Sequence, residues 1–149
     1  MPQSLVLICP DSVCLSSLEL KMKGRFEVKN VKIGEGYQEL QINSDDLSTR
    51  LSIGEIVDRL EAVDDYKEND LLSSEFREGI DETYRCFLIG FNDLLAIKGL
   101  VLFLVRHFED IFKMGWIDTE YGYVLSAAKF CSNMSEDSDW DWRSKPGAA

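Results

Sequence analysis

Hydrophobic and polar residues alternate in the first third of the chain, which is the pattern of half-buried antiparallel strands. A short apolar run over residues 4–9, ended by Pro10, predicts a buried strand before them. The alternating segments, which we expect to form a three-stranded meander, are residues 17–23, 26–33 and 37–42. A bulge near Asn30 is expected in the second of these segments, because its apolar positions shift there by one residue.

The apolar spacing becomes helical after residue 50. Ser52 followed by Glu55 has the form of a capping box, and it predicts a helix over residues 52–63. A polar connection is expected over residues 64–70. The further helices predicted by the spacing span residues 71–81, 94–114 and 126–131.

Residues 84–91 are apolar on both faces except at Arg85, which predicts a central strand buried on both sides. Two short extended segments, 116–118 and 121–125, are expected around a turn. This order of elements predicts an α+β fold, with a mostly antiparallel sheet of about 5–6 strands packed against 3–4 helices.

The chain has 149 residues and an apolar fraction of 45%, which fit one folded domain. We place that domain at residues 1–143 and predict a disordered tail of small residues at 144–149. The N-terminal apolar run is too short for a signal peptide, and the apolar stretch 94–105 is shorter than the roughly 20 residues that span a bilayer. The four cysteines form no CxxC pair, so we predict reduced thiols and a cytoplasmic protein away from membranes.

The net charge is −11, from 16 basic and 27 acidic residues, and it argues against nucleic-acid binding because phosphates would be repelled. The excess lies in residues 35–83, which hold four basic and fifteen acidic side chains. The last fifteen residues add a further −2. Such a cluster is either a solvated face or a surface that steers a basic partner.

No pattern of catalytic residues emerges. The single histidine, His107, lies near the end of a predicted helix, where a solvated imidazole is expected. Zinc lacks a ligand set, and the acidic loop 137–141 lacks the glycine and glutamate of an EF-hand. We therefore predict no enzyme, no cofactor and no metal; a hydrolase using clustered carboxylates is a remote alternative.

Aromatic and acidic residues gather in the segment 116–126 and again in 139–143. The segments either pack on the sheet edge, with solvated carboxylates, or form a binding surface in which Tyr and Trp supply contact area. The candidate partner-binding residues of these segments are Asp118, Glu120, Tyr121, Tyr123, Asp139, Trp140, Asp141 and Trp142. A second candidate patch consists of Asp64, Asp65, Glu68 and Asp70.

The C-terminal half resembles immunity proteins of bacterial polymorphic-toxin and contact-dependent inhibition systems. The resemblance rests on the aromatic strand 84–91, the apolar helix 94–114, the W-I-D-x-E-Y-G-x-V-x-S segment at 116–126 and the acidic Trp-containing segment 139–142. It implies tight, inhibitory binding of a cognate toxin domain, and acidic immunity proteins commonly face basic toxins. The alternative is a small cytosolic adaptor or regulatory module with no toxin partner.

Overall fold

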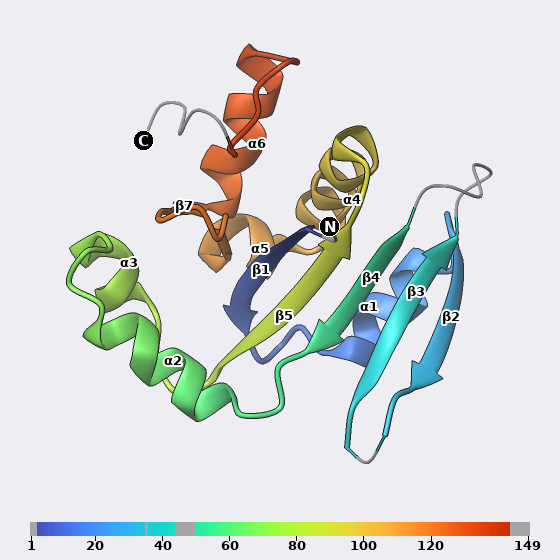
Figure 1. The fold of residues 1–149 in the computed structure, drawn as a ribbon, viewed down its shortest axis with the longest axis horizontal. Helices are drawn as coiled ribbons and strands as arrows, with labels where there is room; N and C mark the ends of the chain where they lie inside the picture. Colours follow the sequence, from blue (N-terminus) through green and yellow to red (C-terminus); the bar gives the residue numbers. More distant parts are fainter. Residues whose placement is uncertain (1–2, 35, 44–49, 144–149) are drawn as a thin grey trace.

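A computed structural model describes residues 3–34, 36–43 and 50–143. Seven antiparallel strands form one sheet in the order β2-β3-β4-β5-β1-β6-β7 (Figure 1). The strands are β1 (Gln3–Pro10), β2 (Glu27–Lys32), β3 (Gln38–Asn43), β4 (Leu51–Glu55), β5 (Tyr84–Phe91), β6 (Trp116–Asp118) and β7 (Val124–Ser126). The helices are α1 (Leu15–Met22), α2 (Arg59–Glu68), α3 (Ser74–Gly79), α4 (Leu94–His107), α5 (Glu109–Met114) and α6 (Ala127–Glu136). The predicted α+β fold is confirmed, with somewhat more strands and helices than expected; the predicted tail at 144–149 lies outside the described residues.

The main core lies on one face of the sheet. Alternate residues of the central strands, such as Leu7 on β1 and Ile89 on β5, point into it and are fully buried. Side chains from α1, α4, α5 and α6 complete this core, among them Leu18, Leu104 and Phe130. Burying such a continuous apolar face supplies most of the free energy of folding.

A smaller core lies on the opposite face. Here α2 and α3 cover Ile8 and Cys86 with Val63 and Phe76. The ring of Phe76 packs edge-on against Trp116, with the centroids 5.2 Å apart. The two helices are thereby fixed at the β1–β5–β6 side of the sheet.

The prediction of a strand over residues 17–23 is wrong, because most of these residues lie in α1, which spans Leu15–Met22. Leu18 and Met22, four residues apart, are buried on one face of the helix, whereas Leu20 is exposed. The Ser17 hydroxyl accepts a hydrogen bond from the Cys14 amide at 3.0 Å and closes a capping box. The cap favours a helix, whereas the alternation of apolar residues in this segment also fits a strand.

The helix predicted over 52–63 is also wrong in its first part. Residues Leu51–Glu55 form β4 between β3 and β5, and α2 begins at Arg59 after the N-cap Asp58. Pairing with a strand on each side outweighs the local capping-box pattern. The meander therefore contains β2, β3 and β4, and the polar connection expected at 64–70 falls largely within α2.

Two smaller expectations also change. The ladder between β2 and β3 runs without interruption from Glu27 to Lys32, so the bulge expected near Asn30 is absent from this pair of strands. The long apolar helix is divided at Phe108 into α4 and α5, because Phe108 has the extended φ of −128°. The central position of β5 is confirmed.

Candidate partner-binding surface

The two C-terminal tryptophans lie in the core. Trp140 and Trp142 are each 1% exposed and pack against Phe130, with ring centroids 5.1 and 5.0 Å away. Trp142 also contacts Phe91 on β5. Their assignment to a partner-binding surface is therefore wrong, because two rings of this size gain more from burial in the main core than from standing in solvent.

Their polar neighbours hold this segment onto the domain. The Arg143 guanidinium bonds to both oxygens of Asp141, at 2.8 and 2.6 Å, and to Oε1 of Gln3 at 2.7 Å. The bonds from Arg143 keep the pKa of the Asp141 carboxyl below its usual range. The half-buried Tyr123 donates to the Trp142 carbonyl at 2.8 Å. Asp141 and Tyr123 thus serve the fold, whereas Asp139 is exposed.

The β6–β7 turn presents the most accessible candidates. Glu120 has φ of +62°, a left-handed conformation that costs a residue with a Cβ about 1–2 kcal/mol. Its amide donates to Asp118 Oδ1 at 2.8 Å, and the Thr119 hydroxyl donates to the Tyr123 carbonyl at 2.8 Å. These bonds hold the turn so that Tyr121 stays 51% exposed. A strained turn that displays an aromatic ring and a carboxylate is typical of a binding site.

Asp118 connects this turn to α2. The Tyr66 hydroxyl donates to Asp118 Oδ2 at 2.6 Å, linking residues far apart in the sequence. Burial first, and then the nearby Asp118 carboxylate, raise the pKa of Tyr66 far above its usual value. The turn and α2 therefore form one continuous surface.

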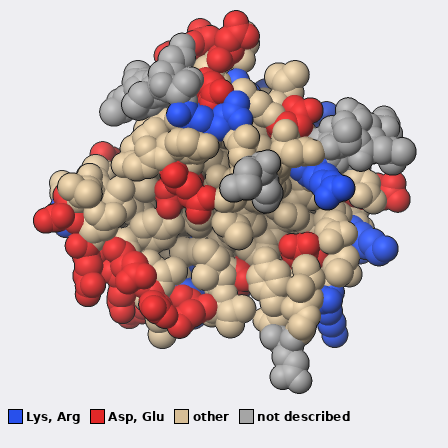
Figure 2. Space-filling model, viewed as in Figure 1, with Lys and Arg blue, Asp and Glu red and all other residues tan. Residues whose placement is uncertain are grey.

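The second candidate patch lies on that surface. Asp64, Asp65 and Glu68 on α2, and Asp70 just beyond it, are all exposed. Figure 2 shows acidic side chains gathered at the lower left, where Figure 1 places α2 and α3. The neighbouring Asp58 carboxylate, through a shared hydrogen bond and charge repulsion, raises the pKa of Glu61. Carboxylates crowded in this way favour the approach of a cation.

A region that the sequence analysis missed is the part of the second sheet face beyond α2 and α3. We define the open face as the residues that point outward there from neighbouring strands: Ser4, Glu39, Gln41, Ser52, Leu88 and Gly90. Gly54 lies among them but is buried, because the Tyr37 side chain occupies the place where a Cβ of Gly54 would lie. A cavity of about 470 Å³ opens at one end of it, beside Gln41, Ser52 and Gly90. The alternation of Ser and Gly in 52–54 and of Leu and Gly in 88–90 carried the signal, but only the strand register shows that these residues meet.

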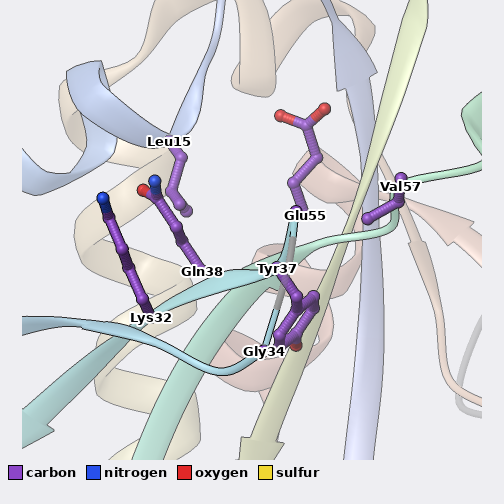
Figure 3. Close-up of a pocket in the computed structure, with 8 residues that line it drawn as sticks. Leu15, Lys32, Gly34, Tyr37, Gln38, Glu55 and Val57 are labelled. Carbon is purple, nitrogen blue, oxygen red and sulfur yellow. The ribbon is translucent and has the colours of Figure 1, made fainter.

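A second cavity, of about 440 Å³, lies at the start of β3 and the end of β4 (Figure 3). Its charged lining residues are Lys32 and Glu55. The Glu55 carboxylate is already occupied, because Arg85 Nη1 bonds to both of its oxygens at 2.9 and 3.0 Å. This ion pair joins β4 to β5, so Glu55 has a structural role in the cavity wall.

The four cysteines are free thiols. Burial strongly raises the pKa of Cys9, which makes that thiol inert. At the N-cap of α1, hydrogen bonds from Ser16 and Ser17 instead lower the pKa of Cys14 to about 7. Within residues 3–34, 36–43 and 50–143, no three His, Cys, Asp or Glu side chains are grouped to hold a metal ion.

Comparison with family models, curated proteins and solved structures gives no match for this chain. In the part of the chain that the structure describes, no helix combines the length and apolar character needed to cross a membrane. The candidate surface must therefore be interpreted from its own chemistry.

Proposed function

We propose that the chain is an immunity protein that binds and neutralises a cognate toxin domain, with no catalytic activity of its own. The toxin domain is basic, and binding takes place in the cytoplasm. The contact surface consists of the β6–β7 turn and α2, with Glu120, Tyr121 and the acidic side chains of α2 in direct contact. Binding there would cover the toxin's active site or its access to substrate.

The observation that carries this proposal is the bond between Tyr66 and Asp118. It joins two acidic segments, each a separate candidate in the sequence, into one surface. An acidic surface raises the association rate of a basic partner through long-range attraction. The exposed ring of Tyr121 supplies the kind of aromatic anchor that dominates many interfaces.

The test is co-expression with the product of the adjacent gene, scored for rescue of growth and for co-purification. A larger adjacent reading frame with a basic C-terminal domain, toxic alone and harmless when co-expressed, is the expected result. An adjacent product that is not toxic, or that stays toxic in the presence of this chain, would refute the proposal and favour an adaptor module.

The surface itself is tested by replacing the exposed Glu120 with lysine. Asp118 is kept, because it accepts the hydrogen bonds from Tyr66 and from the Glu120 amide that hold the turn. Toxin affinity is expected to fall, with the largest loss at low salt, because attraction is replaced by repulsion. An unchanged affinity would show that the turn is not part of the interface.

A further inference from the structure

We propose that the cavity at the start of β3 and the end of β4 binds a small amphipathic carboxylate, a molecule with one carboxylate group and a short apolar body. This inference is independent of the proposed function. It concerns the end of the sheet formed by β2, β3 and β4, and it uses neither the β6–β7 turn nor the acidic side chains of α2.

Lys32 and Gln38 supply the polar side of the site. They are the last residue of β2 and the first residue of β3, and they pair directly in the antiparallel ladder. Directly paired residues have their side chains on the same face of a sheet, with Cβ atoms about 5 Å apart, so the ammonium and the amide can bind one group together. Figure 3 shows both side chains turned toward Leu15 at the start of α1. Among the residues that the structure describes, neither Lys32 nor Gln38 has a side-chain hydrogen bond or an ion pair.

The charges around the cavity favour a negatively charged ligand. Arg85 neutralises the Glu55 carboxylate, because it bonds to both of its oxygens. Burial raises the pKa of Tyr37, so the hydroxyl of this lining residue stays protonated at neutral pH. Lys32 is therefore the one uncompensated charge among the described residues that line the cavity. In a chain with a net charge of −11, this makes the cavity a local site for an anion.

Glu55 limits the charge that the ligand can carry. The register that pairs Glu39 with Gly54 brings Glu55 next to Gln38 at the ends of β3 and β4. A second negative charge on the ligand would approach this carboxylate with no second free cation to compensate it. A carboxylate has one charge and two acceptor oxygens, which match one ammonium and one amide. A doubly charged phosphate group fits the same donors less well.

Leu15 and Val57 supply the apolar side of the site. Leu15 is half-buried, whereas Val57, between β4 and α2, is 71% exposed. Figure 3 shows the two side chains on opposite sides of Glu55, whose methylene groups lie between them in this view. An apolar group placed against this wall would remove exposed hydrocarbon from water. The cavity therefore has a polar part at Lys32 and Gln38 and an apolar part beside it.

The size of the cavity fits a small molecule. Its volume of about 440 Å³ lies within the range of about 300–1,000 Å³ that is usual for small-molecule sites. Such sites combine an apolar wall with a few polar groups that orient the ligand. A single ring with a short carboxylate side chain matches this arrangement.

The experiment is a titration of the full chain with sodium hydrocinnamate at neutral pH, followed through the backbone amide signals in NMR spectra. The amides of Leu15, Lys32 and Gln38 are expected to shift most and to saturate, with a Kd of about 1 mM for so small a ligand. Phenethylamine, which carries a similar ring with a positive charge, is expected to give no saturable shift there. No saturable shift with hydrocinnamate, or shifts centred on the cavity beside Ser52, would overturn the proposal. Tighter binding of phenyl phosphate than of hydrocinnamate would overturn the assignment to a carboxylate.

Two lysines of β2 provide the matched charge variants. Lys32→Gln is expected to weaken hydrocinnamate binding about fivefold, because it removes the ammonium from the cavity. Lys29→Gln removes the same charge from the same strand, but its side chain lies on the other face, so binding is expected to change less than about twofold. Both lysines are exposed, so both variants are expected to keep the fold. Equal losses in the two variants would overturn the proposal, because binding would then depend on net charge alone.

A second pair of variants tests the apolar side. Val57→Ser is expected to weaken hydrocinnamate binding about threefold, because it removes hydrocarbon from the cavity wall. Leu60→Ser is the control, since Leu60 is 55% exposed in the first turn of α2 but does not line the cavity. Unchanged binding by the Val57→Ser variant, or an equal loss in the Leu60→Ser variant, would overturn the assignment to an amphipathic ligand.

Discussion

Trp142 is expected to be one of the side chains on which the fold most depends. The change considered is Trp142→Ala. The indole is 1% exposed and meets three other aromatic rings, those of Phe91, Phe130 and Trp140, at centroid distances of 5.0 to 5.9 Å. The substitution removes these contacts but keeps the backbone carbonyl that accepts the bond from Tyr123.

The magnitude follows from the burial. Truncating a buried tryptophan to alanine costs about 3–5 kcal/mol, from lost transfer free energy and from the cavity left behind. Because a domain of this size is stable by only about 5–15 kcal/mol, the melting temperature is expected to fall by about 10 °C. The free-energy losses from replacing Trp142 and one of these rings together are not expected to add, since Trp142 contacts each of the other three.

Trp142→Phe separates ring packing from hydrogen bonding. The buried indole nitrogen of Trp142 finds no hydrogen-bond partner among the described residues. An unsatisfied buried donor costs about 1–3 kcal/mol, so removing it offsets part of the lost packing. Trp142→Phe is therefore expected to cost less than about 1.5 kcal/mol.

The assay is urea unfolding followed by far-UV circular dichroism, which does not depend on the altered fluorophore. A loss below about 1 kcal/mol for Trp142→Ala would refute the assignment of Trp142 to the core. Equal losses for the alanine and phenylalanine variants would refute the argument from the unpaired indole nitrogen.

Three further predictions concern single groups. The Cys14 thiol should react with iodoacetamide with a midpoint near pH 7. Ser16→Ala should move that midpoint upward, because it removes the hydrogen bond that lowers the pKa of this thiol most. An unchanged midpoint would contradict this. Glu120→Gly should raise the free energy of unfolding by up to about 1 kcal/mol, measured by calorimetry, because glycine adopts the positive φ without strain, whereas Glu120→Ala should not. Tyr66 has a raised pKa when folded, so it stays protonated in the native state at a pH where the unfolded chain ionises, and stability should fall as the pH rises above about 10. Tyr66→Phe should reduce that slope in thermal melts, and an equally steep slope would exclude Tyr66 as its source.

Where sequence pattern and tertiary pairing agree, the fold could be predicted. The strand at 84–91 lies in the middle of the sheet, with the main core on one face and the smaller core over Tyr84 and Cys86 on the other, and its apolar residues on both faces indicate this position. Asp93 and Ser126 cap α4 and α6 through their side chains, as their residue types indicate. In these places local and global preferences coincide.

The sequence failed where two patterns compete. Leu18, Leu20 and Met22 fit both a strand and a helix, and only the cap at Cys14 and Ser17 decides between them. Ser52 and Glu55 have the sequence pattern of a capping box, but these residues form β4, which pairs with β3 on one side and with β5 on the other. Whether an aromatic residue is buried likewise depends on the whole core. Trp140 and Trp142 alternate with aspartates in the sequence, which is typical of exposed residues, yet both are buried.

The candidate site could be predicted only in part. Exposed acidic residues on α2 and in the β6–β7 turn are evident from composition and spacing. Their contact through Tyr66 and Asp118 depends on a strand order that the sequence does not encode locally. Function that arises from register is therefore the part that a single sequence conceals.

The position of β1 has a consequence for synthesis of the protein on the ribosome. Of the seven described strands it is the first in the chain, yet Gln3 pairs with Phe91 on β5 and Val6 pairs with Asp118 on β6. Its apolar face stays unpaired until β5 and β6 have been translated, because these strands lie far along the chain. Strand pairing over such sequence separations is also slow. Nascent chains stalled before residue 84 should accordingly recruit chaperones at β1, and those extended beyond residue 118 should release them.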